Sequence, residues 1–240
     1  MKSIKLTLLV GAMLAAGVAQ AAGPLYVVET PDGLTPLLWD TSNGPIPVYT
    51  DGGEAFAYDF DGVTTFLSIE RANEITQYAF DQWNSVSTSV FQAQVAGTIE
   101  SVTGIADVTG ANAAEIYTQQ NGYGFFVNYD TDGTILSDFF GVGTSVLGIA
   151  FPEWADELTG EILEATAVIN GIAIWENDVN GDEIAGVFTH EFGHAINLSH
   201  SQTNGDVFYA PALQNRQAGP RNCGPYPARS SFEEIETMFP

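Results

Sequence analysis

The stretch THEFGHAINLSHS, which runs from Thr189 to Ser201, contains all three histidines of the 240-residue chain. His190 and His194 are four residues apart, and His200 follows six residues later. Each residue of an α-helix advances by about 100°, so the first two imidazoles share one helix face and can reach a single metal ion. Glu191 lies beside that face, where its carboxylate can hold a water molecule and take its proton.

A straight helix cannot bring the third histidine back to the same metal. Six further residues would carry His200 about 600° round and about 9 Å along the helix axis. The chain must therefore turn between His194 and His200. Asn197 is best suited to that turn, because asparagine adopts the left-handed conformation more readily than other residues except glycine. We expect glycine to be accepted at position 197 and a β-branched residue to be poorly tolerated.

Three neutral imidazole nitrogens leave a fourth metal position open, which is the pattern of a catalytic zinc site. A structural zinc site is normally completed by thiolates, and the chain has a single cysteine, Cys223. The alternative is that HExxH arose by chance in a buried helix. The third histidine at a suitable offset, and the absence of any other histidine, favour a metal site with Glu191 as its general base.

The first 21 residues have the pattern of a secretory signal peptide. Lys2 and Lys5 precede an apolar run from Leu8 to Val18, and Ala19-Gln20-Ala21 forms an A-x-A cleavage site. We therefore expect a secreted protein without a membrane span. Residues 22–44, which contain several prolines and glycines, are interpreted as an extended arm or a short pro-segment. Residues 45–240 are interpreted as one domain.

The chain is strongly acidic. It has 30 acidic and six basic residues, and two of the basic residues are the lysines of the predicted signal peptide. The remaining four arginines leave a net charge of −26 on residues 22–240. Such a surface repels nucleic acid and anionic lipid, so neither is expected as a partner.

Periodicity gives a coarse view of the elements. Apolar residues at steps of three and four predict a helix over 68–86 with Ser68 as its N-cap, and a second helix over 183–198. A short helix is predicted over 111–120. Strands are predicted at 46–49, 95–108, 123–129, 146–151 and 165–174.

The segment His190 to His200 resembles the zinc motif of the metzincin peptidases, with Asn197 at the position of their usual glycine, and Ser201 is similar to their matrixin branch. Residues 236–240, Glu-Thr-Met-Phe-Pro, resemble the methionine turn of that branch, with Met238 as its methionine. Residues 141–152 resemble the loop and substrate-binding edge strand of matrixins. The resemblance covers about residues 45–240.

The resemblance implies an α+β (α/β-like) catalytic domain. It implies a twisted, mostly parallel five-stranded sheet with one antiparallel edge strand, an active-site helix and a backing helix. Protein or peptide substrate would add to the edge strand near Gly148, Ile149 and Ala150.

The histidines of the matrixin structural zinc have no counterpart here, so the resemblance implies one zinc. Met238 follows His200 by 38 residues and lies two residues from the chain end, which implies an insertion and a truncated C-terminus. The alternative is that Met238 merely packs in a core.

Two acidic turns are candidate calcium sites. Asp130 and Asp132, with Asp138 further on, gather carboxylates around one turn, and residues 178–182 have the alternate spacing of a calcium loop. The alternative for both is an Asx-rich turn without metal.

Together these features predict a secreted, monomeric, zinc-dependent metalloendopeptidase. His190, His194 and His200 would bind zinc, and Glu191 would transfer the proton from water to the leaving amine. Two alternatives remain open: a secreted zinc- or calcium-binding matrix or adhesion protein that has lost turnover, and a metal-dependent hydrolase of non-peptide bonds.

Overall fold

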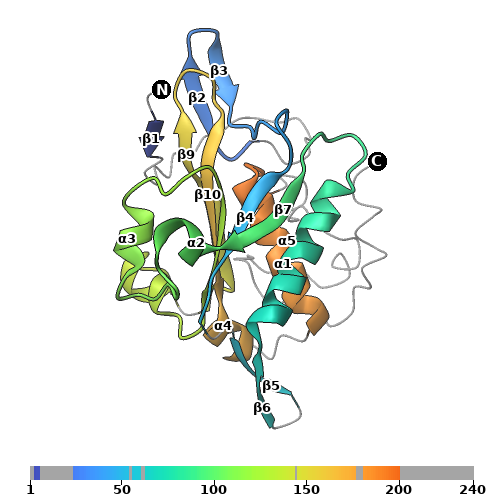
Figure 1. Ribbon diagram of the computed structural model, residues 1–240, viewed down its shortest axis with the longest axis vertical. Coiled ribbons are helices and arrows are strands. Elements are labelled where there is room, and N and C mark those ends of the chain that lie inside the picture. The colour runs from blue at the N-terminus through green and yellow to red at the C-terminus, as the bar shows by residue number, and fades with distance from the viewer. Residues whose placement is uncertain are drawn as a thin grey trace.

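The computed structural model describes residues 3–5, 24–53, 56–60, 63–143, 145–176 and 181–200. Its centre is a twisted sheet with the strand order β1-β9-β10-β8-β4-β7 (Figure 1). The bounds of these strands are β1 Ser3–Lys5, β4 Ile46–Thr50, β7 Ala93–Thr98, β8 Gly124–Asp130, β9 Gly148–Asp156 and β10 Ile162–Asn170.

The pairing of these strands confirms a mostly parallel sheet with an antiparallel edge. β10 and β8, β8 and β4, and β4 and β7 pair in parallel, whereas β9 runs antiparallel to β10. The short β1 adds a sixth strand, antiparallel to β9 at Trp154–Asp156. Within the described residues no strand pairs with the outer edge of β9 before Trp154. That part of the edge is the segment expected to receive substrate.

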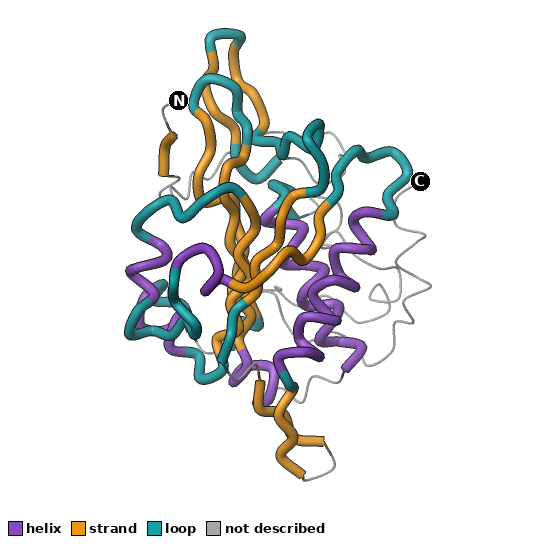
Figure 2. Tube along the Cα trace, viewed as in Figure 1, coloured by secondary structure: helices purple, strands orange, loops and turns teal. Residues whose placement is uncertain are grey.

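Helices cover both faces of the sheet, so the fold has three layers (Figure 2). On one face lie α1 Ile69–Asn84 and α5 Gly181–Ala195, which pack against each other (Figure 1). On the other face lie the short helices α2 Ile99–Thr103 and α3 Ala113–Tyr117 and the π-helix η1 Ile135–Phe139. α5 contains the first two histidines and α1 packs beside it. The role of α5 as an active-site helix stays a prediction.

Alternation along β8 divides the core between the two layers. Phe125 faces α1 and α5, and Phe126 faces α3 and η1. On the first side the rings of Phe80 and Phe192 stack with centroids 4.2 Å apart, which joins α1 to α5. β8 and β10 are buried on both faces, as the inner strands of a parallel sheet are. They are largely apolar, and their buried polar residues are Asn128, Asp130, Glu164, Thr166 and Asn170. The helix that carries the histidines is thus anchored on a rigid core.

Several elements predicted from the sequence are confirmed. Ser68 caps α1, where its hydroxyl accepts a hydrogen bond from the Arg71 N–H at 3.3 Å. The buried residues of α1 recur at steps of three and four, as the pattern predicted. The strands near 46, 123 and 146 and the short helix near 111 also form, with shifted ends.

Two predicted strands were too long. The strand expected over 95–108 ends at Thr98, and the chain then forms α2, which Gly104 closes in the left-handed conformation at φ 82°. The strand expected over 165–174 ends at Asn170, whose side-chain oxygen accepts the Ala173 N–H at 3.1 Å. That contact starts the helix α4 Gly171–Glu176, so an asparagine cap ends the strand.

The segment 22–44 is not simply extended. Within it β2 Val27–Thr30 and β3 Gly33–Pro36 form an antiparallel hairpin. Leu37 is buried in the core, and Leu38 pairs with the start of β10 through its backbone. A second hairpin, β5 Phe56–Phe60 and β6 Val63–Leu67, precedes α1.

Some predictions fall outside the described residues. These are Met238, Cys223, the second acidic turn at 178–180, and most of the predicted signal peptide. In the described part of the chain, no helix has the length and apolar character needed to cross a membrane.

Candidate metal centre

Helix α5 holds the first two histidines and the glutamate in a buried setting. His190 and Glu191 are each 1% exposed, and His194 is 9% exposed. The indole N–H of Trp83 on α1 donates to the Thr189 carbonyl at 2.9 Å, which fixes the helix directly before His190. The packing of α1 against α5 therefore fixes the positions of these side chains. The four-residue spacing places His190 and His194 on one face of α5, as predicted.

The helix ends in a sharp turn at Asn197. Its φ is 77°, and it is the only residue other than glycine with a positive φ in the described part of the chain. The Asn197 N–H donates to the His194 carbonyl and the Leu198 N–H donates to the Gly193 carbonyl, both at 2.9 Å. These bonds close the last helical turn around a left-handed residue. The turn predicted from the spacing of the histidines is confirmed at this residue.

After the turn His200 returns to the other two histidines. Its Nε2 lies 3.0 Å from Nε2 of His194 and 3.3 Å from Nε2 of His190. Metal–nitrogen bonds of 2.0–2.1 Å in a tetrahedral site would separate nitrogens by about 3.3 Å. Among the described residues these three form the only group of three or more histidine, cysteine, aspartate or glutamate side chains close enough together to hold one metal ion. The arrangement can hold a metal through three nitrogens.

One ring is fixed in the tautomer that metal binding needs. Nδ1 of His194 lies 2.8 Å from the Leu198 carbonyl, which can only accept, so Nδ1 carries the proton. The lone pair of Nε2 then faces the other two histidines. Burial lowers the pKa of His194 to about 4 and lowers the pKa values of His190 and His200 as well. The three rings are therefore neutral, and able to act as ligands, at neutral pH.

Glu191 is a buried carboxylate with an unused oxygen. Its Oε1 has no hydrogen-bond partner among the described residues, and burial raises the pKa of the carboxyl group to about 8. A buried carboxylate without a partner is unfavourable for folding. A water molecule or a cation beside the histidines would give this oxygen the partner that it lacks. The unpartnered oxygen is therefore consistent with three histidines that hold a metal ion with a bound water molecule.

Gly148, the first residue of β9, lies against Glu191. A Cβ at position 148 would be 2.8 Å from Cγ of Glu191 and 3.0 Å from the Val168 carbonyl oxygen. Glycine therefore leaves the room that the Glu191 side chain occupies. This contact was not predicted, because the sequence pointed only to a role for Gly148 in the substrate strand.

The three residues expected to receive substrate lie together on the antiparallel edge strand. Gly148, Ile149 and Ala150 pair with Ile169, Val168 and Ala167 of β10. Through Gly148 this part of the strand borders the Glu191 side chain. Their location on the edge strand is as predicted, and the binding of substrate there stays a prediction.

The carboxylates of the acidic turn at 130–138 make hydrogen bonds within their own loop, and calcium binding there stays a prediction. The Asp130 carboxylate accepts the N–H groups of Ile135 and Leu136, and thus caps η1. Asp132 accepts from the backbone and hydroxyl of Thr134, and Asp138 accepts from Ser137. These three do not form a group close enough to share an ion. The Asx-turn interpretation accounts for their contacts, because each carboxylate is used by its own loop.

Comparison with known proteins gives no relative: no family model, no curated protein and no solved structure matches the chain. The histidine cluster and the neighbouring Glu191 are therefore the observations that bear on the function of the chain.

Proposed function

We propose that the chain is a secreted, zinc-dependent metalloendopeptidase of the metzincin type. The observation that carries this proposal is the convergence of three imidazole Nε2 atoms beside the unpartnered carboxylate oxygen of Glu191. Three neutral nitrogen ligands and an adjacent carboxylate are the parts that metal-assisted hydrolysis requires. Export is inferred from the signal-peptide pattern of the first 21 residues.

Zinc is the metal that this donor set favours. His190, His194 and His200 would hold it, and their three nitrogens suit a tetrahedral ion with one open position. When bound, zinc would polarise the scissile carbonyl group and lower the pKa of a water molecule.

Glu191 would then serve as the general base. It is buried directly beside the histidines, with one oxygen free to accept a proton from water and pass it to the leaving amine. A nearby dication would lower the pKa of this carboxyl group from its raised value in the metal-free chain, and so keep it ionised near neutral pH.

The edge of β9 is the proposed place for the substrate. An extended peptide can pair with a free strand edge through its backbone, which suits an enzyme that cleaves within protein chains. Gly148 to Ala150 bring this edge next to Glu191. A peptide held there would place its carbonyl groups near both the base and the metal ligands.

The purified secreted protein should cleave casein or gelatin, and a chelator should abolish the cleavage until zinc is restored. A protein that binds zinc but cleaves neither substrate would favour a matrix or adhesion protein that has lost turnover. Chelator-sensitive cleavage of ester or glycoside substrates alone would instead favour a hydrolase of non-peptide bonds.

A further inference from the structure

The side chain of Asn197 joins the histidine turn to the N-terminal segment 24–39. Its Oδ1 accepts the Tyr26 N–H at 2.7 Å, and its Nδ2 donates to the carbonyls of Tyr26 and Leu37, both at 2.9 Å. Asn197 is 2% exposed, so water does not compete for these bonds. An amide side chain is needed here, because one partner is a donor and two are acceptors.

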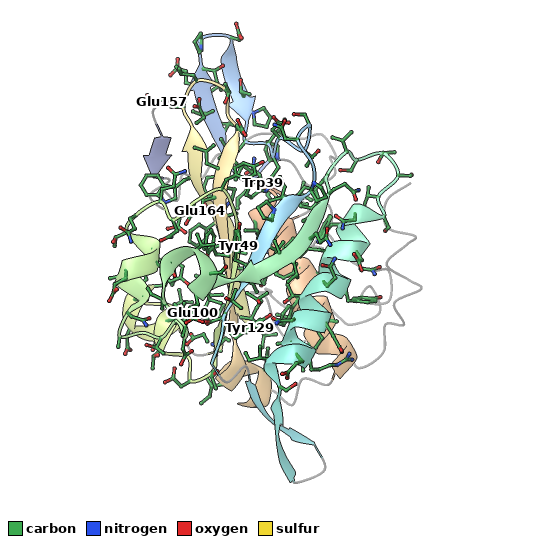
Figure 3. All side chains as sticks on the ribbon, viewed as in Figure 1. Trp39, Tyr49, Glu100, Tyr129, Glu157 and Glu164 are labelled. Atoms are coloured by element: carbon green, nitrogen blue, oxygen red, sulfur yellow. The ribbon has the colours of Figure 1, made fainter. Side chains whose placement is uncertain are left out.

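Backbone contacts extend the same junction on both sides. The Leu25 N–H donates to the Asn197 carbonyl at 2.8 Å, and Pro24 bridges Leu198 in antiparallel register. The indole N–H of Trp39 donates to the Ala195 carbonyl at 3.3 Å, and Figure 3 places Trp39 close to the end of α5. Segment 24–39 is therefore hydrogen-bonded to the last turn of α5 and to the first residues after it.

The residues that are bonded to segment 24–39 also orient the histidines that are proposed to bind the metal. Leu198, which Pro24 bridges, supplies the carbonyl that holds Nδ1 of His194. Asn197 sets the direction in which the chain returns to His200. Glycine would form the same left-handed turn but would leave the polar groups of Tyr26 and Leu37 without their partner. The asparagine thus does more than form the turn, and the expectation that glycine would be accepted changes.

We propose that segment 24–39 is a permanent part of the metal centre and not a removable pro-segment, with Asn197 as the positioning residue that couples the two. This inference rests on the proposed metal site but not on peptidase activity. Loss of the Asn197 amide should loosen the segment and the histidine turn together, although the turn conformation itself remains accessible.

The test compares Asn197→Gly and Asn197→Asp with the parent protein. Glycine keeps the turn and removes all three side-chain bonds. Aspartate also tolerates the left-handed conformation, but it would set an oxygen against the carbonyls of Tyr26 and Leu37. Asn121→Gly is the matched control, because the Asn121 side chain also makes three hydrogen bonds, to Ile116, Gln119 and Glu164.

Two measurements are made on each variant: zinc affinity by competition with a chelator, and amide hydrogen exchange of peptides that cover residues 24–39. Both Asn197 variants should bind zinc about tenfold more weakly, which corresponds to the net loss of roughly one buried hydrogen bond, and should exchange faster in the segment. Asn121→Gly should change neither. Trp39→Phe, a milder variant that loses only the bond to Ala195, should shift both values in the same direction.

Parent-like zinc affinity or parent-like exchange in folded Asn197→Gly would overturn the proposal. If neither Asn197 variant folds, parent-like values in Trp39→Phe would overturn it. So would N-terminal sequencing that finds the active secreted protein to begin after Leu37. Absence of peptidase activity in the parent would contradict the proposed function alone, because neither measurement depends on turnover.

Discussion

Gly148 on the edge strand and Glu191 on the histidine helix are in such close contact that a Cβ at position 148 would lie 2.8 Å from Cγ of Glu191. The strand that is proposed to bind substrate and the residue that is proposed to act as base are thus placed by one contact. Their relative position depends on the absence of a side chain at residue 148.

Gly148→Ala should displace the Glu191 carboxylate, since the new methyl group would also lie 3.0 Å from the Val168 carbonyl oxygen, which belongs to the backbone of β10. Misplacement of a reacting group by about 1 Å can cost about a hundredfold in rate. We therefore expect kcat to fall by about that factor while zinc content stays at the parent level. Gly122→Ala is the control, because its Cβ would make only an ordinary contact, 3.5 Å from Cγ1 of Val102. Equal kcat in both variants would show that the contact does not position the base.

His200→Ala should lose most of the bound metal, because the two remaining imidazoles cannot complete a site for zinc. Elemental analysis of the purified parent should give about one zinc per chain. Glu191→Gln serves as the comparison, since it keeps all three ligands and should retain its zinc. Two tightly bound zinc ions in the parent would show that another site exists.

Asn197→Val should weaken zinc binding, because a β-branched residue pays a strain of about 1–2 kcal/mol or more in the left-handed conformation. At φ 77° this strain would displace the turn and, with it, His200. Zinc affinity is measured beside Asn197→Gly, which loses the same side-chain bonds without the strain. If valine and glycine have equal effects, the backbone conformation at residue 197 does not control the third ligand.

In the metal-free protein, Glu191 should make the free energy of unfolding depend on pH. Burial raises the pKa of this carboxyl group from 4.5 to about 8, so between these values the folded chain holds a proton that the unfolded chain has released. Stability contributed by this group should therefore fall as pH rises through that window. The lowered pKa values of the histidines act in the opposite direction, so the contribution of Glu191 must be isolated with a variant.

Glu191→Gln removes this titration and leaves the histidines in place. The metal-free variant should have a melting temperature close to that of the parent near pH 4.5 and several degrees higher near pH 8. In a chain of this size about 1 kcal/mol corresponds to about 2–4 °C. If the two melting temperatures differ by the same amount across the pH range, the buried carboxylate does not destabilise the folded protein as predicted.

Local spacing was enough to predict the histidine site, because a helix and a left-handed turn are nearly rigid over eleven residues. The positive φ of Asn197 followed from where His200 had to return. The contacts of its side chain did not, since Tyr26 and Leu37 are 171 and 160 residues away in sequence. The asparagine in place of glycine was the one signal that could have suggested a partner for the side chain.

A mostly parallel sheet with an antiparallel edge strand was expected from the resemblance, but the ends of the strands at Thr98 and Asn170 were not predicted. At Asn170 the end is set by a side-chain cap, and at Thr98 by the start of a short helix that closes at Gly104. Periodicity alone does not distinguish these features from a continuing strand. The contact of Gly148 with Glu191 also required the packed structure, because it joins two elements that share no local pattern.

The most direct test of the account is the kcat/KM of Glu191→Gln on a peptide substrate, measured at the same zinc occupancy as the parent. The variant keeps the three histidines and a side chain of equal size, and loses only the group proposed to accept the proton. We predict a loss of about a hundredfold to ten-thousandfold with zinc content unchanged. Hydrolysis at the parent rate by the zinc-loaded variant would contradict the assignment of Glu191 as the base and the mechanism proposed from it.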